Sequence, residues 1–228
     1  MKKILLMIPV AFIITLASAQ NMAQVSLSNS NTAANFYFLI DGNVLVNVSN
    51  DGNIIEWGTA MQQGRINYYP GKLEPFIGRV EYYGSTSNEA FIGKPKYIGS
   101  AAITYYASYE NENFTGKVKS IGSVVLEYYA PFDNDAFKGK LKTAGAVAIG
   151  YYASYDNEAL RSKLKSIGST IISYYSSYDD KAFKGKLKSI GSFGYTYFSS
   201  FEQKEYRGGM KTGNYMQLVN GINYILKY

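Results

Sequence analysis

A 23-residue unit is repeated five times without a gap between Ile98 and Thr212. The third and fourth copies read AGAVAIGYYASYDNEALRSKLKS and IGSTIISYYSSYDDKAFKGKLKS. Tandem units of this length are typical of repeat architectures, in which each copy is one small element stacked on its neighbours. The copies occupy residues 98–120, 121–143, 144–166, 167–189 and 190–212, and a shortened copy precedes them at 77–97.

Each copy contains two stretches with the two-residue period of a β-strand. Residues 183–188 alternate apolar or small side chains with lysine, and residues 193–201 are rich in aromatic side chains. Such patterns predict strands, and the polar residues between them predict turns. Each copy is therefore expected to be one β-hairpin, and the array a continuous antiparallel meander.

The odd period constrains the register, because side chains alternate between the two faces of a sheet. Equivalent residues share a face only if one loop is even and the other odd, or if a bulge intervenes. We expect a four-residue turn at 179–182 and a three-residue turn at 189–191, with Gly191 left-handed. Each Tyr-Tyr pair then has one ring on each face. The apolar face would carry Phe183, Gly185, Leu187, Tyr195, Tyr197 and Phe201, with Ile172, Tyr174 and Tyr178 from the copy before.

The predicted fold class is all-β, an antiparallel meander of tandem hairpins forming an elongated, twisted or curled sheet that is capped at both ends. Repeat arrays need caps to shield their open edges. Residues 36–76 contain three strand-like runs separated by Asp-Gly turns, and we interpret them as the N-terminal cap. Residues 213–228 contain an Asn-Gly turn between two apolar runs, and we interpret them as a C-terminal hairpin cap of the array at 77–212.

The first residues have the pattern of a secretory signal peptide. Lys2 and Lys3 precede an apolar run, and Ala17-Ser18-Ala19 has the small side chains of a cleavage site. We therefore expect residues 1–19 to be removed and the protein to be exported, to the periplasm, the cell surface or the extracellular space. Residues 20–35 are small and polar, and we expect them to form a flexible leader.

Two absences in the composition exclude several kinds of site. The chain has no Cys, so it has no disulfide framework, and no His, so Ser-His-Asp triads and His-ligated zinc are excluded. Loss of Lys2 and Lys3 with the signal would lower the formal charge from +6 to +4. This mild excess is spread along the chain, so we expect no nucleic-acid partner.

The unit resembles the MORN repeat in its 23-residue length, its aromatic-x-Gly motif and its acidic turn. The motif occurs as Phe114-Thr-Gly116, Phe137-Lys-Gly139, Phe183-Lys-Gly185 and Tyr206-Arg-Gly208. The resemblance covers residues 77–212, although the mid-repeat glycines are displaced and the Tyr-Tyr pair is additional. It implies an elongated, twisted antiparallel sheet that makes membrane-proximal or protein contacts.

The face opposite the apolar one is the predicted ligand-binding surface. Its rings offer flat apolar area, and its ammonium groups attract anionic polymers. The alternative is a solvated face on which lysine stems pack against tyrosine rings. The candidate binding residues are Tyr106, Tyr129, Tyr152, Tyr175, Phe198, Lys140, Lys163 and Lys186.

Carboxylates also recur, but we assign them no catalytic or metal role. The acidic turns, such as Asp156-Asn-Glu158, could bind Ca²⁺, yet Asp and Asn are also ordinary turn residues. Glu81 and Glu127 occupy equivalent positions two copies apart, about 19 Å at standard strand spacing. Glycosidase carboxylates lie about 5–10 Å apart. We therefore expect a protein that is not an enzyme and has no cofactor.

We interpret the chain as an exported scaffold or binding protein of the cell surface or envelope. Its partner would be a protein, an anionic glycan or a membrane surface, and the sequence does not specify an oligomeric state. The apolar face must be buried, so the sheet would curl, fold on itself or dimerise. The alternative is an outer-membrane β-barrel, a pore or anchor, which the alternating, aromatic end of the chain at 222–228 favours and the short turns oppose.

Overall fold

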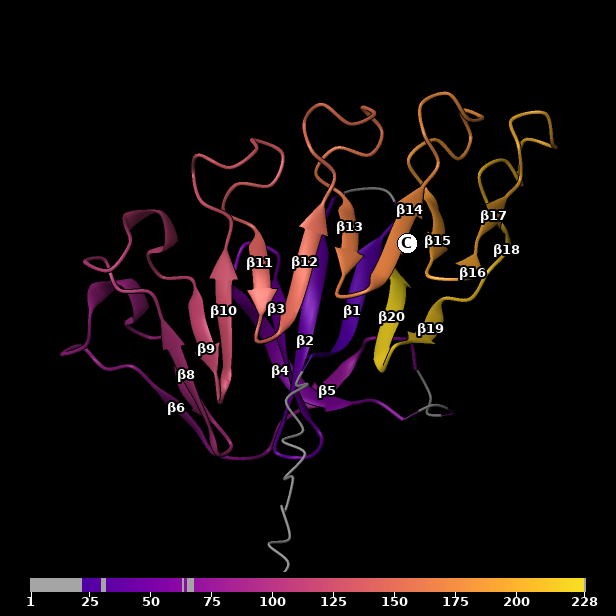
Figure 1. The fold of residues 1–228 in the computed structure, drawn as a ribbon. Helices are drawn as coiled ribbons and strands as arrows, with labels where there is room; N and C mark the ends of the chain where they lie inside the picture. The colour runs from indigo at the N-terminus through magenta and orange to yellow at the C-terminus, as the bar shows by residue number, and fades with distance from the viewer. Residues whose placement is uncertain (1–21, 30–31, 63, 65–67, 228) are drawn as a thin grey trace, which may run out of the picture.

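Two β-sheets lie face to face in the computed structural model, which describes residues 22–29, 32–62, 64 and 68–227 (Figure 1). One sheet is built by the repeats, and we call it the repeat sheet. The other is built by the two ends of the chain, and we call it the terminal sheet. The predicted signal peptide at 1–19 lies outside the described residues. Among these residues, no helix has the length and apolarity needed to cross a membrane.

The repeat sheet is an 11-stranded antiparallel meander in which neighbours in sequence are neighbours in space. The predicted fold class is therefore confirmed. Its end strands β6 and β16 are not paired with each other, so the sheet is open. A short pair, β17 and β18, continues the pattern of hairpins. The strands are β6 (Val80–Tyr82), β7 (Pro95–Ile98), β8 (Ala101–Tyr105), β9 (Val118–Ile121), β10 (Val124–Tyr128), β11 (Leu141–Ala144), β12 (Val147–Tyr151), β13 (Leu164–Ile167), β14 (Thr170–Tyr174), β15 (Leu187–Ile190), β16 (Phe193–Gly194), β17 (Thr196–Tyr197) and β18 (Met210–Thr212).

The terminal sheet has seven strands in the order β19-β20-β1-β2-β3-β4-β5. Strand β1 runs parallel to β20, so the first and last strands of the fold are neighbours. The flexible leader predicted at 20–35 is wrong for residues 22–28, because β1 is a mostly buried strand with Val25 fully covered. The strands are β1 (Met22–Ser28), β2 (Ala34–Ile40), β3 (Val44–Ser49), β4 (Ile54–Ala60), β5 (Leu73–Pro75), β19 (Met216–Val219) and β20 (Ile222–Lys227).

The repeat register differs from the predicted one. Ile190 pairs with Phe193 across a two-residue turn, Gly191-Ser192, and Tyr174 pairs with Leu187, which leaves residues 175–186 as a twelve-residue loop. Both connections are even, and the odd period comes from a bulge at Lys188. The predicted three- and four-residue turns are therefore wrong, and the bulge is the alternative that the odd period allowed.

The predicted strand at 183–188 begins only at Leu187. Gly185 has a φ of +75°, which turns the chain out of the extended conformation. Its amide still donates to Tyr175 O at 2.7 Å, and Tyr175 N donates to Lys186 O at 2.9 Å. These two bonds close the base of the loop, so residues 176–184 stand outside the ladder.

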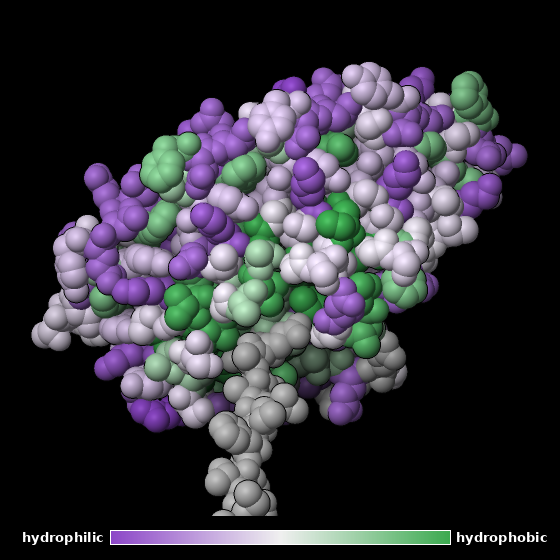
Figure 2. All heavy atoms as spheres, viewed as in Figure 1, coloured by the Kyte–Doolittle hydropathy of each residue, from purple (hydrophilic) through white to green (hydrophobic). Residues whose placement is uncertain are grey.

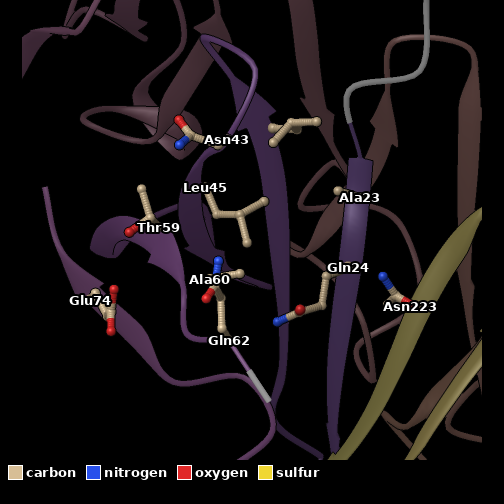
Figure 3. Close-up of a pocket in the computed structure, with 10 residues that line it drawn as sticks. Ala23, Gln24, Asn43, Leu45, Thr59, Ala60, Gln62, Glu74 and Asn223 are labelled. Carbon is tan, nitrogen blue, oxygen red and sulfur yellow. The ribbon is translucent and has the colours of Figure 1, made fainter. Parts of the chain in front are cut away.

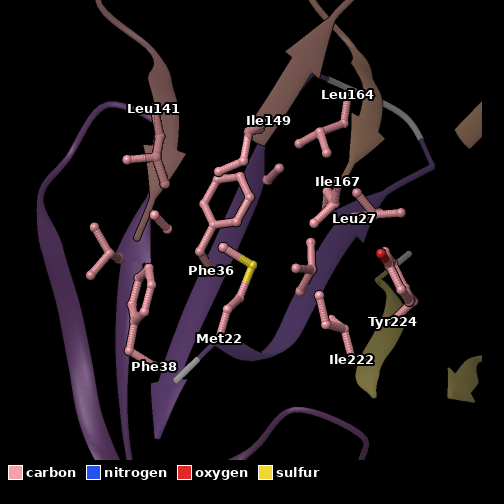
Figure 4. Close-up of a cluster of buried hydrophobic side chains, with 14 of the residues drawn as sticks. Met22, Leu27, Phe36, Phe38, Leu141, Ile149, Leu164, Ile167, Ile222 and Tyr224 are labelled. Atoms are coloured by element: carbon pink, nitrogen blue, oxygen red, sulfur yellow. The ribbon is translucent and has the colours of Figure 1, made fainter. Parts of the chain in front are cut away.

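The apolar face of the repeat sheet is covered by the terminal sheet. Figure 4 shows Phe36 and Phe38 of β2 among Leu141, Ile149 and Leu164 of the repeats. Leu187, Ile172 and the first tyrosine of each pair lie on this face, as predicted. We call these rings the inner tyrosines, and they are 4–6% exposed. They are Tyr105, Tyr128, Tyr151, Tyr174 and Tyr197.

The cover ends at the first, shortened copy. Tyr82 occupies the position of an inner tyrosine there, yet 53% of it is exposed. Tyr82 lies on β6, which is an end strand of the repeat sheet. The terminal sheet therefore buries the inner tyrosines of the five full copies and leaves the shortened copy at its rim.

The turns of the terminal sheet bind the repeat sheet at specific backbone groups. Val118 N donates to Gly52 O at 2.9 Å, and Leu141 N donates to Asn50 O at 2.7 Å. Leu187 N donates to Asn29 Oδ1 at 2.9 Å. Each of these amides follows or adjoins a bulge, where the strand ladder offers it no partner. The contact between the two sheets is therefore polar at its edges as well as apolar at its centre.

Candidate binding surface

Long loops emerge at one edge of the repeat sheet, and short hairpin turns lie at the other (Figure 1). Two of these loops contain a short 3₁₀ turn in their acidic part: η1 (Glu89–Phe91) in the shortened copy and η2 (Glu112–Phe114) in the first full copy. We call this edge the loop edge. Its five full loops are residues 106–117, 129–140, 152–163, 175–186 and 198–209.

The predicted aromatic ladder lies at the base of these loops and is half-buried. Tyr129 packs against Phe137 at 4.6 Å between ring centroids, and its Oη donates to Ile149 O at 2.9 Å. The Nζ of Lys142 lies 5.5 Å from the Tyr129 ring centroid. Burial raises the pKa of the Tyr129 hydroxyl. We call this set the base aromatics; it comprises Tyr106, Tyr129, Tyr152, Tyr175 and Phe198.

The same contacts recur around the other base tyrosines. Their hydroxyls donate to a backbone carbonyl of the next copy at 2.9–3.1 Å, and in each case the acceptor lies 20 residues further on. The structure thus brings these residues together as links between copies. Their role in ligand binding stays a prediction.

The three predicted lysines also link neighbouring copies. Lys140 Nζ donates to Ser162 O at 2.9 Å and lies 5.2 Å from the Tyr151 ring centroid. Lys186 donates to Gly208 O in the same way, and Lys163 is only 7% exposed above the Tyr174 ring. Burial lowers the pKa of all three amines. Their charge therefore faces ring and carbonyl groups of the protein.

A different row of aromatic side chains stands at the loop tips. Its members follow the base aromatics by three residues, and they are 83–93% exposed. We call them the tip aromatics: Tyr109, Phe132, Tyr155, Tyr178 and Phe201. The predicted register was wrong here, because it placed Tyr178 and Phe201 on the buried face. A sequence signal for them exists: each tip aromatic is followed directly by Asp or Glu, as at a turn.

In four of the five full loops, the carboxylate after the tip aromatic accepts a hydrogen bond that holds the loop in shape. Asp133 Oδ2 accepts from Ala130 N at 2.6 Å, and Asp156 and Asp179 accept from their own loops at the same distance. The hydrogen bonds from Ser176 lower the pKa of the Asp179 carboxyl. Among the described residues, no group of three or more His, Cys, Asp or Glu is placed to hold a metal ion. The bonds that these carboxylates accept from their own loops are ordinary turn chemistry.

Neighbouring loops are also bound to each other. Asn157 Nδ2 donates to Ser177 Oγ at 2.8 Å, and Ser177 N donates back to Asn157 Oδ1 at 3.0 Å. Asn134 and Ser154 form the same pair, at 3.0 and 2.9 Å. Asp180 accepts from both the amide and the hydroxyl of the next loop's serine. These bonds link the loops that carry Phe132, Tyr155, Tyr178 and Phe201 to one another.

A shallow groove of about 570 Å³ lies between two tip aromatics, Tyr155 and Tyr178. Polar groups from both loops form its floor and walls, and they are Asp156, Asn157, Glu158, Arg161 and Ser177. Figure 2 shows the surface over the loops as mostly hydrophilic, with apolar residues in separate places. The groove thus combines two exposed aromatic rings with both hydrogen-bond donors and hydrogen-bond acceptors.

A second concavity, of about 510 Å³, lies on the terminal sheet (Figure 3). Gln24 and Asn223 reach into it from β1 and β20, and Leu39 and Leu45 supply apolar contacts. The Nε2 of Gln24 is buried and has no hydrogen-bond partner within the described part of the chain. The pocket is built from amide and aliphatic groups and contains one carboxylate, Glu74.

The carboxylates considered for glycosidase chemistry are far apart. Glu81 lies on β6 and Glu127 on β10, four strands away in the repeat sheet. Glu81 pairs with Arg79, whose Nε donates to it at 2.7 Å, and Glu127 accepts from Thr143 Oγ1 at 3.0 Å. Their contacts are with neighbours on the same face of the sheet.

Comparison with family models, curated proteins and solved structures finds no match to this chain. The resemblance to MORN repeats therefore rests on the residues quoted for it. The observed class is an all-β protein of two stacked sheets, in which hairpin repeats form one layer and the chain ends form the other. Its most regular exposed feature is the row of tip aromatics.

Proposed function

We propose that this protein is an exported, non-enzymatic binding scaffold of the cell surface or envelope, and that it holds an extended partner along its loop edge. One observation carries the proposal. Five aromatic side chains occupy equivalent positions on five successive loops, and each is at least 83% exposed. A regular row of exposed rings favours an interaction role, whereas apolar side chains that are exposed singly are ordinary on a protein surface.

The rigidity of the loops supports this role. Four of the five full loops are closed by a bond to their own carboxylate, and the loops from residue 129 onward are bound to each other through an Asn or Asp side chain, as for Asn157 and Ser177. Binding orders groups that were free, and that ordering opposes association. Rings on loops that are already fixed lose little further freedom, since a Tyr or Phe has only two rotatable side-chain bonds.

The spacing of the loops favours an extended partner over a small ligand. Successive loops are two strands apart, about 10 Å at ordinary strand spacing, so five tip aromatics span roughly 40 Å. A ligand that contacts several rings gains from multivalency, because each further contact is intramolecular. A polymer or the surface of a large assembly fits this geometry.

The base aromatics and the lysines Lys140, Lys163 and Lys186, which we call the inner lysines, would support the surface from below. They hold the copies in register through bonds such as Tyr129 Oη to Ile149 O and Lys140 Nζ to Ser162 O. They position the loops, and the tip aromatics make the contact.

The proposal is tested with a triple variant, Phe132→Ser, Tyr155→Ser and Tyr178→Ser. The wild type is expected to co-sediment with isolated cell-envelope material, and the triple variant to bind at least about tenfold more weakly. The control variant is Ile55→Ser with Leu218→Ser, which removes two exposed apolar side chains, at 55% and 59%, from the terminal sheet.

Circular dichroism and urea unfolding establish that each variant is folded before binding is compared. Equal binding by the wild type and the triple variant would refute the role of the tip aromatics. Equal losses in the triple variant and the control would indicate nonspecific apolar adsorption, and would refute it as well.

A further inference from the structure

Each tip aromatic has hydrogen-bond acceptors beside it. The carboxylate that follows the ring uses one oxygen for its own loop, as Asp156 does with Oδ2 toward Ala153 N. A carboxylate offers about four lone-pair sites on its two oxygens, so it keeps capacity to accept from a ligand. Acceptors at this position favour a ligand that carries many donors.

The full loops that follow residue 128 also carry a cation near their acidic residues. In the groove between Tyr155 and Tyr178, the guanidinium of Arg161 donates through Nε to Asp156 O at 3.1 Å. Glu158 pairs with Lys184 of the next loop at 2.5 Å. In the preceding loop, Asp135 pairs with Lys138 at 2.8 Å.

Opposite charges are thus compensated within the loop edge itself. A surface of this kind has no strong field of one sign, and it attracts neither a polyanion nor a polycation by charge. The lysines that were expected to attract anionic polymers are turned inward, where Lys140 and Lys186 bind carbonyl groups. The ligand that fits the exposed groups is consequently neutral.

A neutral ligand with many hydroxyl groups satisfies both kinds of polar group. A hydroxyl donates to a carboxylate and accepts from a guanidinium or ammonium group. The C–H face of a sugar ring is apolar and carries slight positive charge at its hydrogens, so it packs on the negative face of an aromatic ring. Sites that take small polar units combine flat apolar surface with a few placed polar groups, as the groove does.

We infer that the loop edge binds a neutral polysaccharide, with one sugar-stacking subsite at each tip aromatic. This inference rests on the proposed function and names its partner. The subsites recur about every 10 Å along the edge, so an extended chain meets several rings at once. Affinity should therefore rise with the length of the glycan until the row is filled.

The test uses isothermal titration calorimetry with the full chain. Hydroxyethyl cellulose, xyloglucan and dextran serve as neutral probes, alginate as the anionic probe and a polyproline peptide as the protein-like probe. We expect binding to at least one neutral probe, and a loss of about tenfold or more in the double variant Tyr155→Ser with Tyr178→Ser. The double variant Ile55→Ser with Leu218→Ser should bind as the wild type does.

A second measurement checks the arrangement of the subsites. Oligosaccharides of increasing length, taken from the neutral probe that binds, should bind progressively more tightly to the wild type. The increase of affinity with length should be smaller in the variant Tyr155→Ser with Tyr178→Ser. A fully conservative change, Tyr155→Phe with Tyr178→Phe, should keep most of the affinity, because the ring face is retained.

Three results would overturn the inference: no binding to any neutral probe, binding to alginate or polyproline alone, or equal affinity in the wild type and the double variant. The outcome also separates the two proposals. If envelope binding depends on the tip aromatics while no neutral polysaccharide binds, the glycan inference fails and the scaffold proposal stands. If the triple variant still binds the envelope, the scaffold proposal fails, and the inference that rests on it fails too.

Discussion

The two kinds of loop aromatic should differ sharply in what they contribute to stability. Tyr129→Phe removes the hydroxyl that donates to Ile149 O at 2.9 Å and leaves the ring contacts with Phe137 and Tyr151 in place. Loss of one hydrogen bond to the carbonyl of a buried residue such as Ile149 costs about 1–2 kcal/mol. Phe132→Ala removes a side chain that is 89% exposed, and such surface changes stay within about 0.5 kcal/mol.

Urea unfolding followed by circular dichroism measures this difference. One core cluster includes residues of both sheets, so a single transition is expected, and the slope should be the same for all three proteins. For a domain of this size, Tyr129→Phe should lower the melting temperature by roughly 2–8 °C. The reasoning is refuted if Phe132→Ala destabilises the protein as much as Tyr129→Phe does.

Three further predictions follow from bonds and conformations described above. Burial raises the pKa of Tyr197 to about 12 and raises those of the other inner tyrosines, so the folded state favours their neutral form. The free energy of unfolding should therefore stay constant below about pH 10 and fall above it. Burial also lowers the pKa of the inner lysines, and this smaller effect acts in the opposite sense. Urea midpoints measured between about pH 9 and about pH 11 will show the fall, and a constant midpoint would contradict it. Gly191 has a φ of +55° in its two-residue turn, so Gly191→Ala should cost about 1–2 kcal/mol in thermal unfolding, while its neighbour's variant Ser192→Ala should be nearly neutral; similar losses in both would argue against the turn. Asp180→Ala should speed hydrogen exchange at the Ser200 amide, which donates to Asp180 at 3.0 Å, and leave strand amides unchanged; unchanged exchange at Ser200 would mean that loop ties do not fix the loop edge.

The repeat pattern predicted the core of the repeat sheet well. Alternation placed Leu187 with Ile172, Tyr174, Tyr195 and Tyr197, and all of them are buried. These positions are close in sequence to their strand partners, so local pattern and pairing agree. The constraint from the odd period was also sound, since it required unequal loops or a bulge.

The pattern was misleading where a loop imitates a strand. Phe183-Lys-Gly-Lys-Leu187 alternates like a strand, but Gly185 leaves the extended conformation and Phe183 belongs to a loop. Period two over a few residues does not distinguish these cases. A register that continues through the loop places Tyr178 in the core, and it therefore does not predict the row of tip aromatics.

The terminal sheet could not be found by local reasoning. Strand β1 is small and polar in part, and its sequence resembles a leader. Its parallel partner is β20, where Val25 lies opposite Tyr224, almost 200 residues away in the chain. No local turn or spacing reports such a pairing, so the cover over the apolar face remained an open question at the level of sequence.

The rim at Tyr82 has a consequence for how many copies the fold can hold. The inner tyrosines of the five full copies are 4–6% exposed, whereas Tyr82 of the shortened copy is 53% exposed. The width of the terminal sheet thus limits the number of copies whose inner tyrosine it can bury. Open solenoids can gain or lose units because each unit contacts only its neighbours. Here an inserted unit would add an inner tyrosine that the terminal sheet cannot cover, and a deleted unit would expose part of the apolar face of the terminal sheet. Copy number is therefore fixed by the part of the chain that does not repeat.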